Sequence, residues 1–172
     1  MIVVICGPAG AGKTTIASRV RRRLTTCGHD VRVSRSDDFS RNTYEQLYAD
    51  VAIDPDPPQS KPDGHSVHLV DGTFYKSRWQ RAFRTLEDVR FVYVTASLET
   101  CLERNSRRAD AIDERGVYVI HHEFAAPDTG LVVDTDELSA EEVVERIVRA
   151  IGAWRVGEEA TRTANGSKAR NE

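Results

Sequence analysis

The residues with the clearest chemistry form a glycine-rich loop near the amino end. Residues 7–14 read Gly-Pro-Ala-Gly-Ala-Gly-Lys-Thr, which satisfies the pattern G-x-x-x-x-G-K-[ST] in full. A loop that wraps a polyphosphate must turn its backbone N–H groups inward, and this requires glycines at crowded or left-handed positions. An apolar run precedes the loop and an amphipathic segment follows it. The loop therefore predicts binding of a nucleoside triphosphate. The alternative is a glycine-rich turn that only links a strand to a helix.

Each part of this loop has an expected role toward ATP and magnesium. Lys13 is expected to reach the β- and γ-phosphate oxygens, and Thr14 to offer its hydroxyl to Mg²⁺. The helix that begins at Lys13 points its positive end at the same phosphates. The other loop positions expected to contact the nucleotide are Gly7, Gly10, Ala11 and Gly12.

Several classes of phosphate-loop protein fit the rest of the chain poorly. The N-K-x-D motif that reads guanine is absent from the sequence. A motor or AAA-type ATPase usually needs a larger domain and a lid that faces an oligomer. A small kinase, which moves a phosphoryl group from ATP to an acceptor under an arginine-rich lid, is the favoured class.

The acceptor side of such a kinase lies at the carboxyl ends of its strands. Asp37, Asp38 and Arg41 follow the apolar run Val31–Ser34, and Asp71 ends the run Val67–Asp71. We expect Asp37, Asp38 and Arg41 to face the acceptor, together with Thr73 and Lys76 after the later run.

Two of these carboxylates are candidates for catalysis. Asp71 could hold Mg²⁺, directly or through water, or accept the proton of the acceptor hydroxyl. Asp38 could equally be that base. Each could instead cap a helix, Asp71 a helix from Thr73 onward and Asp38 a helix over Arg41–Val51. The sequence predicts that one of the two is catalytic and leaves open which.

A cluster of arginines predicts the lid. Arg104, Arg107 and Arg108 follow the fourth apolar run, and the stretch continues to Arg115. Clustered guanidinium groups can neutralise the charge on a phosphoryl group in transfer and stack on adenine. We expect Arg107 to act in catalysis. The alternative is that these arginines form an ordinary solvated surface.

The elements that must position these residues alternate along the chain. Short apolar runs predict five strands, over Ile2–Cys6, Val31–Ser34, Val67–Asp71, Phe91–Thr95 and Leu131–Asp134. Segments with helical spacing lie between them, and the clearest begins with the capping box Ser139-Ala-Glu-Glu142. Strand–helix alternation predicts a three-layer α/β fold with a mostly parallel five-stranded sheet, like that of the nucleotide kinases.

Two segments break this alternation. Residues 54–66 hold four prolines and predict a loop before the third strand. Residues 156–172 are polar without an apolar stripe, which predicts a disordered tail after a kinase domain over residues 1–155.

Composition limits the partners and the compartment. The 24 basic and 27 acidic residues leave a net charge of −3, so no strong basic field favours a long nucleic acid. The longest apolar run is far below the ~20 residues that cross a membrane. The three cysteines are scattered and unpaired in spacing, which favours a reducing compartment, and we expect a cytoplasmic monomer or homodimer.

The order of motifs resembles the adenylyl-sulfate kinase family over roughly residues 1–152. The matching stretches are the phosphate loop, Asp38 and Arg41 after the second strand, residues 92–104, residues 127–135 and the capping box. This family transfers phosphate from MgATP to the 3′-hydroxyl of adenylyl sulfate in sulfate assimilation. The resemblance implies that Thr15 joins the loop in binding ATP and magnesium, and that Arg104 and Thr135 lie near the adenine.

One strand end differs from that family. Residues 70–75 read Val-Asp-Gly-Thr-Phe-Tyr, where the family has an uncharged sequence. An aspartate followed by a threonine there is similar to seryl-tRNA kinase, polynucleotide 5′-kinase and the tRNA-wobble-modification ATPases. The sequence therefore keeps three hypotheses: a kinase with a small nucleotide-like acceptor, a kinase or ATPase directed at tRNA, and a non-catalytic ATP-binding regulator.

Overall fold

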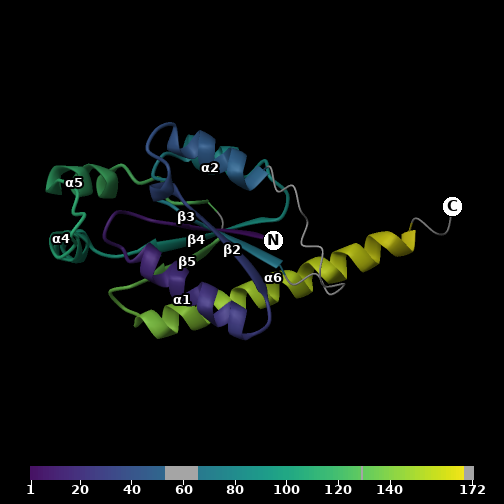
Figure 1. Cartoon of the computed structure of the whole chain (residues 1–172). Coiled ribbons are helices and arrows are strands. Elements are labelled where there is room, and N and C mark those ends of the chain that lie inside the picture. The colour runs from purple at the N-terminus through teal and green to yellow at the C-terminus, as the bar shows by residue number, and fades with distance from the viewer. Residues whose placement is uncertain (53–65, 129, 169–172) are drawn as a thin grey trace.

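The computed structural model describes residues 1–52, 66–128 and 130–168, and side chains as far as Gly157. Most of the proline-rich loop predicted over residues 54–66 lies outside the described residues. The described chain forms a sheet covered by helices on both faces (Figure 1).

Five parallel strands form the sheet, in the order β2-β3-β1-β4-β5. Their bounds are β1 Ile2–Cys6, β2 Asp30–Arg35, β3 Ser66–Asp71, β4 Val89–Thr95 and β5 Leu131–Asp134. The predicted parallel sheet and all five predicted strands are confirmed, with ends that agree within two residues. Because β3 and β4 flank β1, the loop that leaves β1 lies between the ends of its two neighbours.

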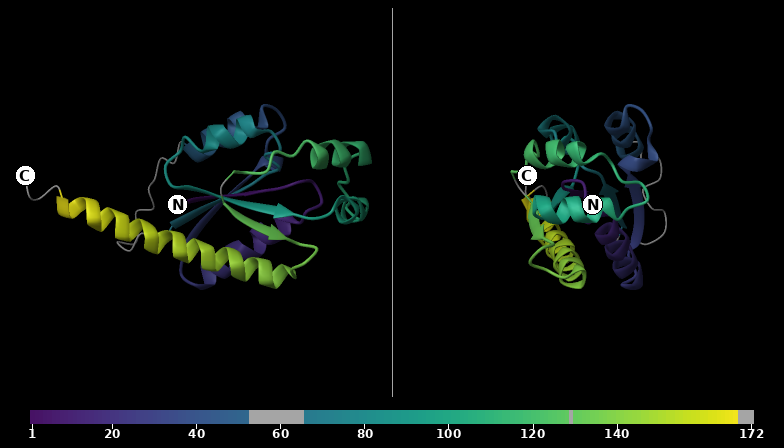
Figure 2. Two further views of the ribbon diagram at one scale, coloured as in Figure 1. Left: turned by 180° about the vertical axis from the view of Figure 1, so that it is seen from behind. Right: turned by 90° about the vertical axis from the view of Figure 1, so that its left-hand side faces the viewer.

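The helices fall into two layers and a cap. Their bounds are α1 Lys13–Thr26, α2 Thr43–Ala52, α3 Ser77–Phe83, α4 Leu98–Ser106, α5 Glu114–His122 and α6 Ala140–Lys168, and a short 3₁₀ turn, η1, spans Ser36–Asp38. Helices α1 and α6 cover one face of the sheet, and α2 and α3 cover the other (Figure 2). The three-layer α/β fold is therefore confirmed.

Helical spacing of apolar residues explains which faces these helices bury. In α1, Ile16, Val20 and Leu24 recur every four residues and pack with Ile147 and Ile151 of α6. On the opposite face, the core gathers Leu47, Val51, Val70, Phe74, Phe83 and Phe91. The phosphate-binding pattern thus joins two elements that are fixed by packing, β1 and α1.

Helices α4 and α5 lie beyond the end of the sheet at which the strands finish (Figures 1 and 2). The arginine cluster predicted a lid here, but no helix was predicted over Glu114–His122. The Asp113 carboxylate accepts a hydrogen bond from the Arg115 N–H and so begins α5, and Val117 is buried beneath it. No described helix is long and apolar enough to span a bilayer.

The carboxyl end of the chain differs from the prediction. Helix α6 continues to Lys168, past the start of the predicted disordered tail at residue 156, and projects beyond the sheet on the side away from α4 and α5. The composition of residues 156–168 does not by itself favour a helix, because these residues include two glycines and two threonines. The division into a domain over residues 1–155 and a tail stays a prediction.

Candidate active site at the carboxyl ends of the strands

The glycines of the phosphate loop occupy conformations that other residues rarely adopt. Gly10 and Gly12 have φ angles of 86° and 94°, in the left-handed region. A Cβ atom on Gly10 would lie 2.3 Å from the carbonyl oxygen of Cys101 in α4. The loop therefore needs glycine at position 10 for its backbone angle and for its close approach to α4.

The loop borders a cavity of about 410 Å³. Its lining residues are Gly10, Gly12, Lys13, Thr14, Thr15, Arg104 and Arg108. The structure thus brings together five residues predicted from the loop and two from the arginine cluster. A cavity lined by backbone N–H groups at a helix amino end and by three cationic side chains suits a polyphosphate.

Lys13 is held over the loop and lies near two acids. Its Nζ donates a hydrogen bond to the carbonyl oxygen of Pro8, 2.9 Å away. Burial lowers the pKa of Lys13 from 10.5, and the negative charges of Asp71 and Asp37 raise it in part. A partly buried ammonium group beside a cavity gains from an incoming anion, because it has lost some of its own hydration.

Asp71 lies at the end of β3, in register with Ile5 of β1 and Arg35 of β2. Its residue is 4% exposed, and it lies close enough to Lys13 and Thr14 for both side chains to lower its pKa. Burial raises the pKa of Asp71, and the charge of Lys13 opposes that rise. The alternative assignment of Asp71 as a helix cap is wrong, because α3 begins only at Ser77 and follows Lys76.

The donors at this point suit a magnesium ion. Thr14 supplies a hydroxyl and Asp71 a carboxylate, and hard oxygen ligands of this kind are the ones that Mg²⁺ prefers. The two side chains lie near each other, since the Thr14 side chain lowers the pKa of Asp71. The residues present therefore fit the ion that the phosphate loop implies.

The two acids of η1 differ in their surroundings, although both are exposed. Asp37 is the one whose negative charge raises the pKa values of Lys13, Asp71 and Tyr44. The assignment of Asp38 as a helix cap is wrong, because Asp38 ends η1 and α2 begins at Thr43. Asp37 is thus the η1 carboxylate whose charge reaches the site, whereas the sequence left open whether Asp38 or Asp71 is the base.

Two arginines of the predicted lid line the cavity, and the third does not. Arg104 donates to the Thr135 hydroxyl at 2.8 Å and to the Thr135 carbonyl at 3.2 Å. Arg108 pairs with Asp110 through two hydrogen bonds of 3.0 and 2.6 Å. Arg107 has a side chain that is 72% exposed and pairs with Glu103 of its own helix. Arg108, rather than Arg107, is therefore placed to contact a phosphate.

The remaining predicted residues surround the acceptor side. The carbonyl of Thr73 accepts a hydrogen bond from the Gly7 N–H at 3.3 Å, which ties the segment after β3 to the phosphate loop. Lys76 is exposed, with its Nζ 5.2 Å from the centre of the Tyr75 ring. Arg41 is exposed ahead of α2. Thr73 thus joins the phosphate loop, whereas Lys76 and Arg41 make no described contact with it.

Sequence reasoning missed two residues at this site. Arg35 ends β2 next to Asp71 and lowers the pKa of that carboxyl, and its Nε is buried without a hydrogen-bond partner among the described residues. The Tyr44 hydroxyl accepts a hydrogen bond from the Phe74 N–H at 2.8 Å. Arg35 could have been found as a charge at a strand end, but Tyr44 is an ordinary member of an apolar stripe.

Comparisons with known proteins agree with this arrangement. No curated protein sequence matches the chain. The APS kinase of Mycobacterium tuberculosis, solved with AMPPNP and APS, is 20% identical, with 88% of this chain and 96% of that chain covered and a TM-score of 0.69. A gluconokinase from Sinorhizobium meliloti 1021 is 14% identical, with 94% and 95% covered and a TM-score of 0.66. Kti12 from Chaetomium thermophilum, solved with ADP-AlF3, is 16% identical, with 88% and 99% covered and a TM-score of 0.64.

These structures share the fold of this chain, and two of the three are kinases by name. A family model described as an AAA domain matches residues 3–118. AAA-type ATPases were set aside in the sequence because they usually need a larger domain. That argument does not apply to this family, because the matched region is only residues 3–118. That region holds the phosphate loop, Asp71 and both cavity-lining arginines and exceeds half of the 172 residues. The chain therefore belongs to the AAA domain family, and it has the fold of P-loop kinases such as APS kinase.

Proposed function

We propose that this protein is a kinase that transfers the γ-phosphoryl group of ATP to a hydroxyl group of a small, nucleotide-like acceptor. The observation that carries the proposal is the burial of the Asp71 carboxylate close to Lys13 and Thr14, two residues that line the cavity. A loop that only linked a strand to a helix would need neither a buried carboxylate nor a partly buried ammonium group close to it. Their burial costs free energy that a bound metal and phosphate would recover.

Each residue of the site has its own role in the proposed phosphoryl transfer. Lys13 and Arg108 neutralise charge on the transferring group, and Thr14 and Asp71 would hold a magnesium ion, which would supply further positive charge to the phosphates. Asp37 or Asp38 accepts the proton of the acceptor hydroxyl as its oxygen bonds to the γ-phosphorus. The bond from that phosphorus to the β,γ-bridging oxygen breaks, and ADP leaves with the electron pair.

Adenylyl sulfate is the first acceptor to test. Its support is the run of shared motifs over residues 1–152 together with the fold shared with the mycobacterial APS kinase. Arg104 lines the cavity, and its partner Thr135 adjoins the phosphate loop, since the Thr135 hydroxyl lies 3.2 Å from the Ala11 carbonyl. We propose that this pair adjoins the adenine of ATP.

Product analysis tests the reaction and the acceptor together. Protein, MgATP and adenylyl sulfate are incubated, and the products are resolved by ion-pair chromatography. We expect the 3′-phosphorylated product and ADP in equal amounts, and neither with Lys13→Ala. If ADP forms while adenylyl sulfate is untouched, the acceptor assignment is wrong and tRNA is tested next. If no nucleotide binds or reacts, the kinase proposal fails.

A kinase or ATPase directed at tRNA is the second candidate, and one observation favours it. The sequence Asp71-Gly72-Thr73 ends a strand where adenylyl-sulfate kinases are uncharged, and the structure buries that aspartate. Salt separates the two candidates. Binding of a tRNA should fall steeply as ionic strength rises, because phosphate contacts release counterions, whereas turnover of a small acceptor should change far less.

A further inference from the structure

The peptide group between Thr73 and Phe74 is bound at both of its ends. Its carbonyl oxygen, on Thr73, accepts from the N–H of Gly7 at the start of the phosphate loop, at 3.3 Å. Its N–H, on Phe74, donates to the hydroxyl of Tyr44 in α2, at 2.8 Å. One peptide plane therefore links the phosphate loop to a helix on the acceptor side of the sheet.

This peptide is held in an orientation that the backbone does not favour by itself. Phe74 has a φ of 53°, in the left-handed region that bulky residues rarely occupy. Rotation of the Thr73–Phe74 peptide by half a turn would give Phe74 a negative φ, which bulky residues ordinarily adopt. The same rotation would turn the Thr73 carbonyl away from Gly7. The observed orientation is thus the strained one of two, and hydrogen bonds must maintain it.

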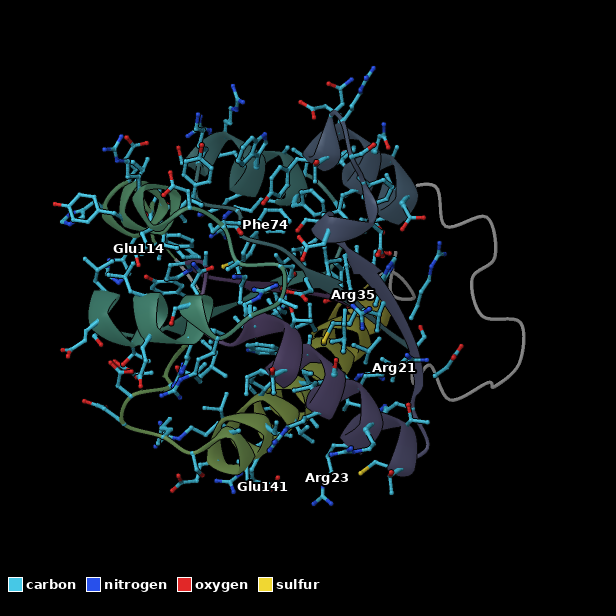
Figure 3. All side chains as sticks on the ribbon, turned by 60° about the vertical axis from the view of Figure 1, so that its left-hand side comes forward. Arg21, Arg23, Arg35, Phe74, Glu114 and Glu141 are labelled. Atoms are coloured by element: carbon cyan, nitrogen blue, oxygen red, sulfur yellow. The ribbon has the colours of Figure 1, made fainter. Side chains whose placement is uncertain are left out.

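Packing fixes the Phe74 side chain but not the peptide before it. Phe74, labelled in Figure 3, is fully buried in the core under α2 and α3. Its ring is in edge-to-face contact with Tyr44 and Phe83. The carbonyl of Phe74 is bound on the α3 side by the Gln80 side chain at 2.9 Å. These contacts hold the ring and the carbonyl of Phe74. Its N–H, which belongs to the preceding peptide, is bound by the Tyr44 hydroxyl.

The Tyr44 ring is itself held firmly. It stacks on Trp79 with ring centres 4.0 Å apart and planes 17° apart. Burial raises the pKa of Tyr44 to about 12, so its hydroxyl stays protonated at neutral pH. Thr73 and Asp37 both lie near enough to influence the pKa of this hydroxyl. A fixed neutral hydroxyl therefore binds the Phe74 N–H and lies near Thr73.

We propose that the Tyr44 hydroxyl is a positioning group for phosphoryl transfer, which latches the Thr73–Phe74 peptide in the orientation that supports Gly7 and presents Thr73 to the acceptor. This inference rests on the proposed kinase function. Without the latch, the peptide can relax, the Gly7 N–H loses its partner, and the phosphate loop and Thr73 lose their fixed separation. Tyr44 acts through these groups and need not touch the substrates.

Two matched substitutions test the latch. Tyr44→Phe removes only the hydroxyl and keeps the ring that stacks on Trp79. Tyr48→Phe is the control, because Tyr48 lies one turn further along α2 and its hydroxyl contacts the exposed Thr85 at 3.1 Å. The measurements are the Kd for MgATP by calorimetry, the rate of ADP release from MgATP, and hydrogen exchange at the Phe74 amide.

We expect Tyr44→Phe to weaken MgATP binding at least threefold, to slow ADP release about tenfold, and to speed exchange at the Phe74 amide. Tyr48→Phe should leave all three within twofold of the unaltered protein. A purely structural role for Tyr44 would lower the melting temperature and leave the Kd of the folded protein unchanged. Equal Kd values and rates for the two variants would overturn the latch alone. If the unaltered protein binds no MgATP, the kinase proposal falls, and the latch falls with it.

Discussion

Arg104 in α4 and Thr135 after β5 form a bridge across the mouth of the candidate site. The guanidinium group donates to both the hydroxyl and the carbonyl of Thr135. That hydroxyl also lies 3.2 Å from the Ala11 carbonyl of the phosphate loop and 3.2 Å from the Thr95 carbonyl at the end of β4. One side chain thus joins the lid, the phosphate loop and two strand ends.

Thr135→Val should remove the hydrogen bonds that the Thr135 hydroxyl makes with Arg104 and with the carbonyls of Ala11 and Thr95. The substitution keeps the shape of the side chain but removes the hydroxyl, and Arg104 then keeps only the longer bond to the main chain. We expect MgATP binding to weaken about tenfold, since a hydrogen bond to a charged group is worth roughly 1.5–3 kcal/mol. Calorimetry measures this. Thr100→Val is the control, because the Thr100 hydroxyl contacts the exposed Ser97. Unchanged affinity in Thr135→Val would mean that the bridge only stabilises the fold.

The two neighbouring lid arginines should differ in their effect on turnover. Arg108 lines the cavity, whereas Arg107 extends into solvent and pairs with Glu103. We expect Arg108→Ala to slow phosphoryl transfer about 100-fold and Arg107→Ala to slow it much less, as loss of an exposed ion pair costs roughly 0–1 kcal/mol. Steady-state rates at saturating MgATP give the comparison. The reverse order would restore the assignment of Arg107 made from the sequence.

Asp71→Asn should remove the contribution of magnesium to nucleotide binding. The amide keeps the size of the side chain but loses the charge that a cation requires. We expect ATP to bind the variant equally well with and without Mg²⁺, and turnover to fall at least about 100-fold. Calorimetry with ATP in EDTA and in MgCl2 separates the two states. A magnesium dependence like that of the unaltered protein would show that Asp71 is not a metal ligand.

The Asp71 carboxyl should set the lower pH limit at which Mg²⁺ still strengthens ATP binding. Burial raises the pKa of Asp71 above its ordinary 3.8, so the folded protein protonates this group at a pH where the unfolded chain is still ionised. Protonation of Asp71 therefore favours the folded state, because the folded protein binds this proton more tightly than the unfolded chain does. Protonation also removes the negative charge that would bind the metal. We expect the affinity gained from Mg²⁺ to decline as the pH falls through that raised pKa, and to show no such decline in Asp71→Asn. A decline centred at 3.8 or below would contradict the burial argument.

Two glycines with the same backbone angle test the fit of the phosphate loop. Gly10 and Gly28 both have a φ of 86°, but a Cβ on Gly10 would meet the Cys101 carbonyl, whereas one on Gly28 meets nothing within 4 Å. Gly28→Ala should lower the free energy of unfolding by about 1–2 kcal/mol, the cost of a left-handed residue. Gly10→Ala should lower the free energy of unfolding by clearly more than Gly28→Ala does, and it should also weaken MgATP binding. Urea unfolding measures both, and equal losses would show that α4 yields readily at Cys101.

The sequence by itself determined the elements and the phosphate loop. Apolar runs such as Ile2–Cys6 and Leu131–Asp134 predicted strands with the bounds that the structure has. The loop ahead of Lys13 was evident because its chemistry depends on consecutive residues. Patterns of this kind are local, since hydrophobic periodicity and loop composition act within one segment.

Only the tertiary structure decided which side chains meet at the site. Arg107 and Arg108 are identical in type and adjacent in sequence, and so are Asp37 and Asp38. The direction in which each points depends on how η1 and α4 pack beyond the strand ends, which no short pattern records. The Tyr44 hydroxyl meets Phe74 from 30 residues away in the chain. Such contacts follow from the strand order β2-β3-β1-β4-β5, which packing of the whole sheet fixes.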